Sequence, residues 1–339
     1  MSVDFMGMLL SRHDLTADQA GMLLRHLADA DQPMAQRVAL LTALTAKGHT
    51  SEELRGMAVV LRDEATRVSL AHMPRPIADT CGTGGDGSHS FNISTASSLL
   101  AAACGLAMAK HGNRGISSRS GSTDVLNALG VPLADGPEMA VQQLDELGFT
   151  YLNAPTFHPM VAGVMPVRQA LGVRTIFNEL GPLINPAQPS HQLLGAFSPD
   201  AARRMAHALA AMDVERAFVV HGTPGWDEAT PCGRFLLCDV QDGRVVEETL
   251  DPVDIAGLPR CEPGELAGDT PQKNARQLSA IFNGARGAVR DAVLLNTALV
   301  LQVAGLVPSV RDGVARASAA IDDGGAMWFL ERAQNWQAG

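Results

Sequence analysis

The sequence predicts an α/β domain preceded by a small unit built from helices alone. Two observations carry this prediction. Residues 1–70 contain helix-capping sequences and apolar residues at helical spacing, but no strand pattern. From residue 73 onward, short apolar strands alternate with helices, which is typical of an α/β domain. The 339 residues suffice for two domains with cores of ordinary size.

The helical unit is expected to contain three helices. The first begins at a capping box in residues 16–19, where Thr is followed three residues later by Gln. The second has Pro33 in its first turn and stops near Gly48. The third opens at residues 50–53 and ends near Arg67.

The α/β part is expected to alternate strands and helices from residue 77. Strands are recognised by short apolar runs with β-branched or aromatic residues, and the hairpin by its turn sequence. In chain order we expect a strand at 77–80, a small-residue helix at 96–109, a buried strand at 217–220, a hairpin of strands 235–240 and 244–250 around Gln241-Asp242-Gly243, and an apolar helix at 291–306.

Composition excludes several classes of protein. Lys and Arg number 26 against 36 Asp and Glu, and this net charge of −10 argues against a nucleic-acid or anionic-membrane partner. The five cysteines form no C-x-x-C pair, so we expect neither a disulfide framework nor a zinc knuckle. The first residues lack a secretory pattern, and the longest apolar stretch, 99–109, is too short to span a bilayer. We therefore expect a cytoplasmic protein.

A glycine-rich loop follows the first predicted strand. Residues 79–87 read D-T-C-G-T-G-G-D-G, and this density of glycine lets the backbone turn tightly and approach a ligand. The next residues, 90–95, include Asn92, Ser94 and Thr95, which suit a helix N-terminus whose free N–H groups attract anions. The pattern is neither G-x-G-x-x-G nor a Walker loop, and an ordinary glycine turn is the alternative.

A basic segment, expected to be a loop, follows the small-residue helix. Lys110, Arg114 and Arg119 fall within ten residues that contain no acid, and Lys110 is one of only three lysines in the chain. Serines and glycines lie between these cations, which suits an anion with several oxygens. The alternative is a solvated surface loop.

An acidic turn lies just after the strand at 217–220. Asp227 and Glu228 are adjacent carboxylates at the carboxyl end of that strand. Mg²⁺ prefers a few carboxylates together with water and substrate phosphates, so this pair is a candidate magnesium site. The alternative is an ordinary acidic surface turn.

Taken together and in order, these motifs resemble the anthranilate phosphoribosyltransferase family over residues 10–333. The motifs are D-x-x-G-T-G-G-D at 79–86, F-N-I-S-T at 91–95, K-H-G-N-R at 110–114, G-S-T-D-V-L at 121–126, A-P with H-P at 154–159, P-V-R at 166–168, R-T-I-F-N at 174–178 and G-P-L at 181–183.

The resemblance implies a fold and an assembly. It implies a small helical domain at 1–72, which helices from about 166–190 rejoin. It also implies a large α/β domain at 73–339, whose central, mostly parallel sheet is like that of nucleoside phosphorylases and phosphoribosyltransferases. Members of this family are usually homodimers.

The resemblance also implies an activity. It is the transfer of a phosphoribosyl group from 5-phosphoribosyl 1-pyrophosphate to the amine of anthranilate, with Mg²⁺, in tryptophan biosynthesis. The partners it implies are these two small substrates, with neither nucleic acid nor membrane.

Site residues follow from the same resemblance. Donor contacts are implied for Gly82, Gly85, Asp86, Ser90, Asn92, Ile93, Ser94, Thr95, Lys110, His111, Gly112, Asn113, Arg114, Ser117, Ser118 and Ser122. Anthranilate contacts are implied for Gly82, Asn113 and Arg168, and magnesium ligands for Ser94, Asp227 and Glu228. Lys110 and Arg168 are the expected catalytic residues, with His111 as a candidate base or a ring that packs on the substrate.

The sequence departs from the family pattern at four positions. Ser90 stands where Thr is usual and Thr123 where Ala is usual, while Glu179 and Trp226 each replace a usual Leu. Three other functions remain open: the same transfer to a modified aromatic acid, a pyrimidine nucleoside phosphorylase, and a non-catalytic family member that binds nucleic acid.

Overall fold

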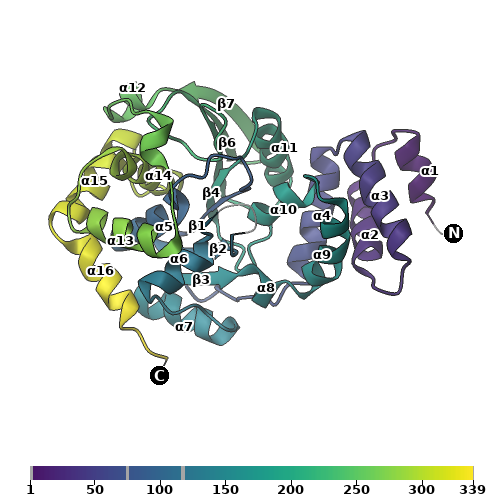
Figure 1. The fold of residues 1–339 in the computed structure, drawn as a ribbon, viewed down its shortest axis with the longest axis horizontal. Helices are drawn as coiled ribbons and strands as arrows, with labels where there is room; N and C mark the ends of the chain where they lie inside the picture. Colours follow the sequence, from purple (N-terminus) through teal and green to yellow (C-terminus); the bar gives the residue numbers. More distant parts are fainter. Residues whose placement is uncertain (1–2, 74–75, 116–118, 339) are drawn as a thin grey trace.

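The computed structural model describes residues 3–73, 76–115 and 119–338 (Figure 1). One seven-stranded sheet has the order β3-β2-β1-β4-β5-β6-β7. Its strands are β1 (Ile77–Gly82), β2 (Ala107–Gly112), β3 (Phe149–Asn153), β4 (His191–Gly195), β5 (Arg216–Gly222), β6 (Phe235–Gln241) and β7 (Arg244–Leu250). The five strands β1 to β5 pair in parallel, whereas β6 and β7 add an antiparallel hairpin at one edge of the sheet. The expected mostly parallel sheet and its hairpin are confirmed.

Helices pack around this sheet and extend beyond one end of it (Figure 1). They are α1 (Phe5–Leu10), α2 (Ala17–Ala28), α3 (Met34–Lys47), α4 (Ser51–Asp63), α5 (Ile93–Ala103), α6 (Ser122–Leu129), α7 (Pro137–Leu147), α8 (Ala154–Phe157), α9 (Pro159–Leu171), α10 (Phe177–Leu183), α11 (Pro199–Ala210), α12 (Pro252–Ala256), the 3₁₀ turn η1 (Pro263–Leu266), α13 (Pro271–Phe282), α14 (Ala288–Val303), α15 (Val310–Asp322) and α16 (Gly325–Gln334). Within the described ranges, no helix is long and apolar enough to cross a membrane.

The N-terminal helices form as their capping sequences predict, with three differences. Both α2 and α4 begin with complete capping boxes, at Thr16 and Thr50. An additional helix, α1, precedes them and is capped by the side chain of Asp4. Pro33 is the N-cap of α3 and so precedes its first turn, and α4 ends at Asp63, earlier than the expected Arg67.

Helices from the middle of the chain pack on the N-terminal ones. Helix α9 packs against α2 and α3, and α10 packs against α4. Two buried arginines reinforce these contacts: Arg37 donates to the carbonyls of Leu27 and Gly163, and Arg62 donates to the carbonyl of Leu183 at 2.7 Å. This packing agrees with the expected return of the middle helices, while the boundaries at 72 and at 166–190 stay predictions.

The expected small-residue helix at 96–109 is wrong in its extent. Helix α5 begins at Ile93 and ends at Ala103, and Gly105, with φ of 89°, turns the chain into strand β2. A run of alanines does not distinguish helix from buried strand by pattern alone, and the glycine was the stop signal. Lys110 and His111 therefore lie on a buried strand and not in a loop.

Candidate functional site

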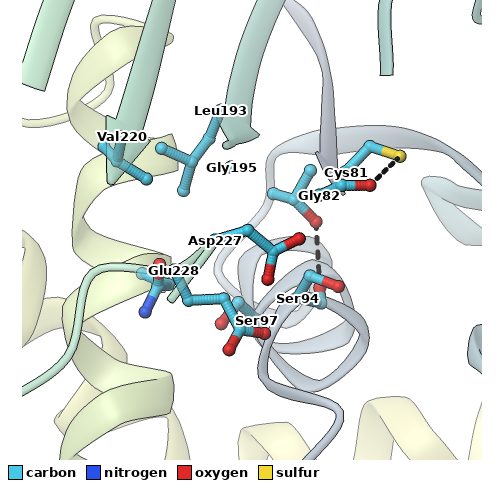
Figure 2. A pocket seen from close by; sticks show the side chains of 11 residues that line it. Cys81, Gly82, Ser94, Ser97, Leu193, Gly195, Val220, Asp227 and Glu228 are labelled. Atoms are coloured by element: carbon cyan, nitrogen blue, oxygen red, sulfur yellow. Dashed lines mark hydrogen bonds between the residues drawn. The ribbon is translucent and has the colours of Figure 1, made fainter. Parts of the chain in front are cut away.

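The glycine-rich loop and the acidic turn meet at the carboxyl ends of β1, β4 and β5. The strand order reverses between β1 and β4, and in α/β sheets such a switch point is where ligands bind. A pocket of about 20 Å³ lies there, enough for one small polar group. Its lining comprises Thr80, Cys81, Gly82, Ser94, Ser97, Leu193, Gly195, Val220, Asp227, Glu228 and Asn296. Figure 2 shows Asp227 directed toward Gly82 and Ser94.

Three glycines at the strand ends make room for the acidic turn. A Cβ on Gly82 would lie 2.3 Å from the Asp227 carboxylate, and one on Gly195 would lie 1.5 Å from the Asp227 carbonyl. A Cβ on Gly222 would lie 2.1 Å from the carbonyl of Glu228. Because these contacts involve backbone or a buried carboxylate, only glycine fits at the three positions. The strand ends therefore form a cradle for the acidic turn.

Hydrogen bonds join the acidic turn to the glycine loop. The Gly84 N–H donates to the Asp227 carboxylate at 2.6 Å, and the Ser90 hydroxyl donates to Glu228 at 3.0 Å. Asp86 accepts from the Asp227 N–H at 3.1 Å and also from Ser88. Asp86 thus braces the loop against the turn, and Ser90 supplies the hydroxyl that the family's usual Thr would supply.

Neither carboxylate of the acidic turn forms an ion pair with a described residue. Burial, followed by the neighbouring carboxylate of Asp86, raises the pKa of Asp227 to about 7. Burial and the charges of Asp227 and Asp86 raise the pKa of Glu228 well above its usual range. The charge of Lys110 opposes only part of this rise. A cation placed between such groups would offset this repulsion and lower both pKa values.

The donor set fits magnesium that is shared with a substrate. The described residues contain no cluster of three or more His, Cys, Asp or Glu able to enclose a metal ion. Mg²⁺ is commonly bound by one or two carboxylates, with the remaining positions filled by water and substrate phosphates. Asp227, Glu228 and the Ser94 hydroxyl supply that kind of incomplete oxygen shell.

Lys110 reaches this site from β2. Its side chain is buried, and its Nζ donates to the Thr80 carbonyl and lies 3.5 Å from the Ser94 hydroxyl. A buried ammonium beside the first turn of α5 places a fixed positive charge next to helix N–H groups. The predicted role of Lys110 in anion binding thus has a structural basis, although its predicted loop setting was wrong.

A second buried carboxylate holds the start of the basic segment. Asp79 accepts from the backbone N–H of His111 at 3.0 Å and from the Asn185 side chain at 2.8 Å. Burial raises the pKa of Asp79 to about 6, and the nearby Lys110 and the Asn185 hydrogen bond oppose a larger rise. This network holds the end of strand β2, on which the basic segment begins.

The start of α5 presents uncapped backbone donors. Asn92 is the N-cap residue, but its side chain makes no capping bond; it instead bonds Ser120 and Asn274. The expected capping role of Asn92 is therefore wrong. Its side chain instead connects the start of α5 to α13 and to the basic segment. Ile93 packs in the core, and the buried Thr95 hydroxyl has no hydrogen-bond partner within the described ranges. In the first turn, the Ile93 N–H donates to the Phe91 carbonyl at 2.6 Å. The N–H groups of Ser94 and Thr95 are available to an anion.

The basic segment turns sharply after β2. Gly112 packs against Tyr151, and Asn113 and Arg114 are exposed. Gly85 has φ of 67° in the facing glycine loop, and Ser122 begins α6. Ser117 and Ser118 lie outside the described residues.

Arg168 of α9 is the expected acceptor-binding residue, and two histidines meet separately at β2 and the start of α9. The Arg168 guanidinium lies 5.5 Å from the centre of the Phe177 ring, pairs with no acidic side chain in the described ranges, and has its pKa lowered by burial. The rings of His111 and His158 meet edge to face with centroids 5.1 Å apart. Burial, and then His158, lower the pKa of His111 to about 3, which makes it a weak base at neutral pH.

Two departures from the family pattern have distinct surroundings. Trp226 packs into the core, and its backbone pairs with Gly222 to close the acidic turn. Glu179 is buried on α10, where it accepts from Arg204 of α11 and lies 3.1 Å from His49 Nε2. Glu179 therefore connects three parts of the chain.

Several site-forming residues carried no signal that sequence reasoning used. Gly195 and Gly222 form the cradle, Asn185 holds Asp79, and Asn296 donates to the Ala229 carbonyl at 2.7 Å behind the acidic turn. Gly222, two residues after the strand predicted at 217–220, was the one available hint for the cradle, because the strand that ends at Gly195 was not predicted.

Known proteins share both the sequence and the fold. Residues 3–65 match the helical bundle domain of the glycosyl transferase family, and residues 74–327 match its a/b domain. The chain is 46% identical to the anthranilate phosphoribosyltransferase of Anaeromyxobacter dehalogenans (strain 2CP-C), with 94% of this chain and 93% of that protein covered. It is 41% identical to the enzyme of the same name from Chromobacterium violaceum, over 96% and 94%.

Solved structures agree with these matches. The anthranilate phosphoribosyltransferase of Thermus thermophilus superposes with a TM-score of 0.90 at 39% identity, with 98% of each chain covered. The Saccharomyces cerevisiae enzyme in complex with PRPP and Mg superposes with a TM-score of 0.85 at 28% identity, over 96% and 95%. On the near-complete coverage by these relatives and on the geometry of the strand-end site, this chain belongs to the anthranilate phosphoribosyltransferase family.

Proposed function

We propose that this chain transfers the phosphoribosyl group of 5-phosphoribosyl 1-pyrophosphate to the amine of anthranilate, in tryptophan biosynthesis. The products are N-(5-phosphoribosyl)anthranilate and pyrophosphate. The observation that carries the proposal is the junction of the glycine loop with the acidic turn. Two hydrogen bonds make this junction, from the Gly84 N–H to Asp227 and from the Ser90 hydroxyl to Glu228. This junction brings anion-binding N–H groups and metal-binding carboxylates to one point.

The donor is strongly anionic, and the chain offers it several positive groups. The N–H groups of Ser94 and Thr95, in the first turn of α5, bind phosphate oxygens at the positive end of the helix. Lys110 adds a fixed charge beside them, and Arg114 lies on the exposed segment that follows. Gly82 and Gly85 let the backbone approach the donor closely.

Asp227, Glu228 and Ser94 would hold Mg²⁺ together with the donor's oxygens. When bound, the ion supplies stabilisation of the negative charge that grows on the departing pyrophosphate. The carboxylates themselves keep the ion at the strand ends, and Gly84 and Ser90 orient them.

The acceptor is an aryl amine that needs positioning more than activation. Arg168 can bind the anthranilate carboxylate with two parallel hydrogen bonds and so direct the amine, and the resemblance implies Gly82 and Asn113 as the other anthranilate contacts. The low pKa of His111 favours its role as a packing surface for the aromatic ring over a role as general base.

The assay is loss of anthranilate fluorescence when the purified chain receives the donor and Mg²⁺. We expect anthranilate to be consumed faster than substituted benzoates. Faster consumption of another aromatic amino acid would instead support the modified-acceptor alternative. Release of a free base from pyrimidine nucleosides with phosphate would support the phosphorylase alternative, and a salt-dependent shift of DNA on a gel would support the nucleic-acid alternative.

The acceptor role of Arg168 has a direct test. Arg168→Ala should raise the anthranilate KM by about 10- to 150-fold, because it removes a charged hydrogen bond worth about 1.5–3 kcal/mol. The donor KM should change little. Arg174→Ala is the matched control, since Arg174 also lies over a phenylalanine ring, that of Phe197 at 4.7 Å. Equal acceptor KM values in Arg168→Ala and the unmodified chain would contradict the role.

The assembly and the domain division are further parts of this proposal. We expect a cytoplasmic homodimer, on the resemblance to the family. We also expect the helical domain at 1–72, joined by the helices of about 166–190, to form a unit distinct from the rest of residues 73–339. The packing of α9 on α2 and α3 supports this division.

A further inference from the structure

Two cysteines outside the proposed active site lie in contact. The Sγ atoms of Cys232 and Cys261 are 3.5 Å apart, although the residues are 29 positions apart in the chain. Both residues are half-buried, and neither is in a disulfide. By contrast, Cys104 and Cys238 are buried. The contact therefore joins two cysteines that are less deeply buried than Cys104 and Cys238.

Neighbouring residues hold the two thiols together. The Arg260 guanidinium donates to the Pro231 carbonyl at 3.4 Å, which joins the residue before Cys261 to the residue before Cys232. Arg260 and Arg234 also both bind Asp251, Arg260 at 2.5 Å and Arg234 at 3.5 Å. The proximity of the thiols is thus fixed by contacts that do not involve sulfur.

We propose that Cys232 and Cys261 form a site of reversible oxidation, at which a peroxide converts the two thiols into an intramolecular disulfide. A disulfide requires the sulfurs to approach to about 2.05 Å, which is about 1.5 Å closer than their 3.5 Å separation. Both thiols lie on connecting segments rather than in helices or strands, so the backbone can follow this small movement. In reducing compartments, disulfides of this kind are transient and redox-sensing.

The chemistry balances with a peroxide as the oxidant. The Cys232 thiolate attacks one peroxide oxygen, the O–O bond breaks, and a sulfenic acid and hydroxide form. The Cys261 sulfur then attacks the Cys232 sulfur, the S–S bond forms, and the S–O bond breaks. The proton lost by each thiol leaves in water, so hydrogen peroxide is reduced to two water molecules and both sulfurs are oxidised.

The two thiols are suited to different steps. Burial, and then the neighbouring Cys232, raise the pKa of the Cys261 thiol to about 12. A thiol with so high a pKa is a poor nucleophile toward the peroxide, which leaves the first attack to Cys232 and the second step to Cys261.

The disulfide would connect the segment after the acidic turn to the segment that pairs with the residues just before α5. Cys232 follows the acidic turn by four residues, and Cys261 precedes η1. Leu266 of η1 accepts from the Phe91 N–H at 2.8 Å, and Gly268 donates to the His89 carbonyl at 2.8 Å. Because the bond closes a loop in the unfolded chain, the oxidised protein should have the higher Tm.

The test uses the full-length chain and hydrogen peroxide at a small molar excess. Peptide mapping without reductant should find the 232–261 linked peptide, with a loss of two hydrogens and a higher Tm, and dithiothreitol should reverse both. The buried-thiol control Cys238→Ser should form the same link, whereas Cys261→Ser should not. A treated protein without the linked peptide overturns the proposal, as does a linkage found only in a covalent dimer.

Discussion

Glu179 and Asp227 are both buried carboxylates, but the chain surrounds them in opposite ways. Glu179 is 1% exposed and lies against two basic side chains, those of Arg204 and His49. Burial raises its pKa, yet the hydrogen bonds and charges of His49 and Arg204 outweigh burial and hold the pKa below its usual range. Asp227, 8% exposed, faces Asp86 and Glu228, and its pKa is raised to about 7.

The difference separates a structural charge from a functional one. A buried carboxylate that is already paired stabilises the fold and has no affinity left for a ligand. A buried carboxylate among like charges destabilises the fold and gains most from a cation. Glu179 therefore holds α10 to α11 and to the α3–α4 connection, whereas Asp227 and Glu228 are suited to bind a cation.

The largest expected effect is at the acidic turn. Asp227→Asn keeps an oxygen that can accept from Gly84 but removes the charge, so activity at fixed Mg²⁺ should fall by about 100-fold or more. Its magnesium titration should shift to higher concentration. A titration curve identical to that of the unmodified chain would remove Asp227 from the metal site, and Glu179→Gln is the matched control, with an unchanged magnesium midpoint.

The next effect is on stability, at the paired carboxylate. Glu179→Gln should lower the free energy of unfolding by about 1–3 kcal/mol, because the Arg204 guanidinium loses its counter-charge and His49 loses its carboxylate partner. Urea unfolding measures this, and Asp227→Asn measured without Mg²⁺ should be no less stable than the unmodified chain at pH 8. Equal destabilisation by both substitutions would erase the distinction between the two regions.

The smallest effect is a difference in pH dependence. The lowered pKa of Glu179 means that its stabilisation is present above the ordinary glutamate pKa and is lost as pH falls through the lowered value. The raised pKa of Asp227 means that the folded chain retains a proton which the unfolded chain releases, so stability falls as pH rises from about 4 to about 7.

Melting curves of the unmodified chain, Glu179→Gln and Asp227→Asn at several pH values test these two pKa directions. The Tm advantage of the unmodified chain over Glu179→Gln should shrink as pH falls below the ordinary glutamate pKa of about 4. The Tm advantage of Asp227→Asn over the unmodified chain, without Mg²⁺, should grow as pH rises toward 8. Parallel pH profiles for all three proteins would contradict the assigned pKa directions.

The sequence predicted motifs better than it predicted the packing around them. The glycine loop, the acidic turn, the capping boxes at Thr16 and Thr50 and the hairpin all have local patterns, and the structure places them as expected. Gly195 has no such pattern, because its need for a bare Cα arises from Asp227, 32 residues later in the chain. Lys110 was placed in a loop because the alanine-rich run before it does not distinguish helix from strand.

The contacts of Glu179 likewise could not be predicted from local patterns in the sequence. The sequence marks it as a departure from the family pattern, but its partners, His49 and Arg204, come from separate parts of the chain. Spacing along one segment cannot reveal a three-way contact of this kind. The fold had to be known before the charge could be recognised as satisfied.

Calorimetry with the phosphoribosyl donor is the most direct test of the central claim. Titration of 5-phosphoribosyl 1-pyrophosphate into the chain with Mg²⁺ present should give saturable heat, and Asp227→Asn should lose most of it while Glu179→Gln retains it. If the donor gave the same heat with the Asp227→Asn protein, or none with the unmodified chain, the strand-end carboxylates would not be the site that binds it.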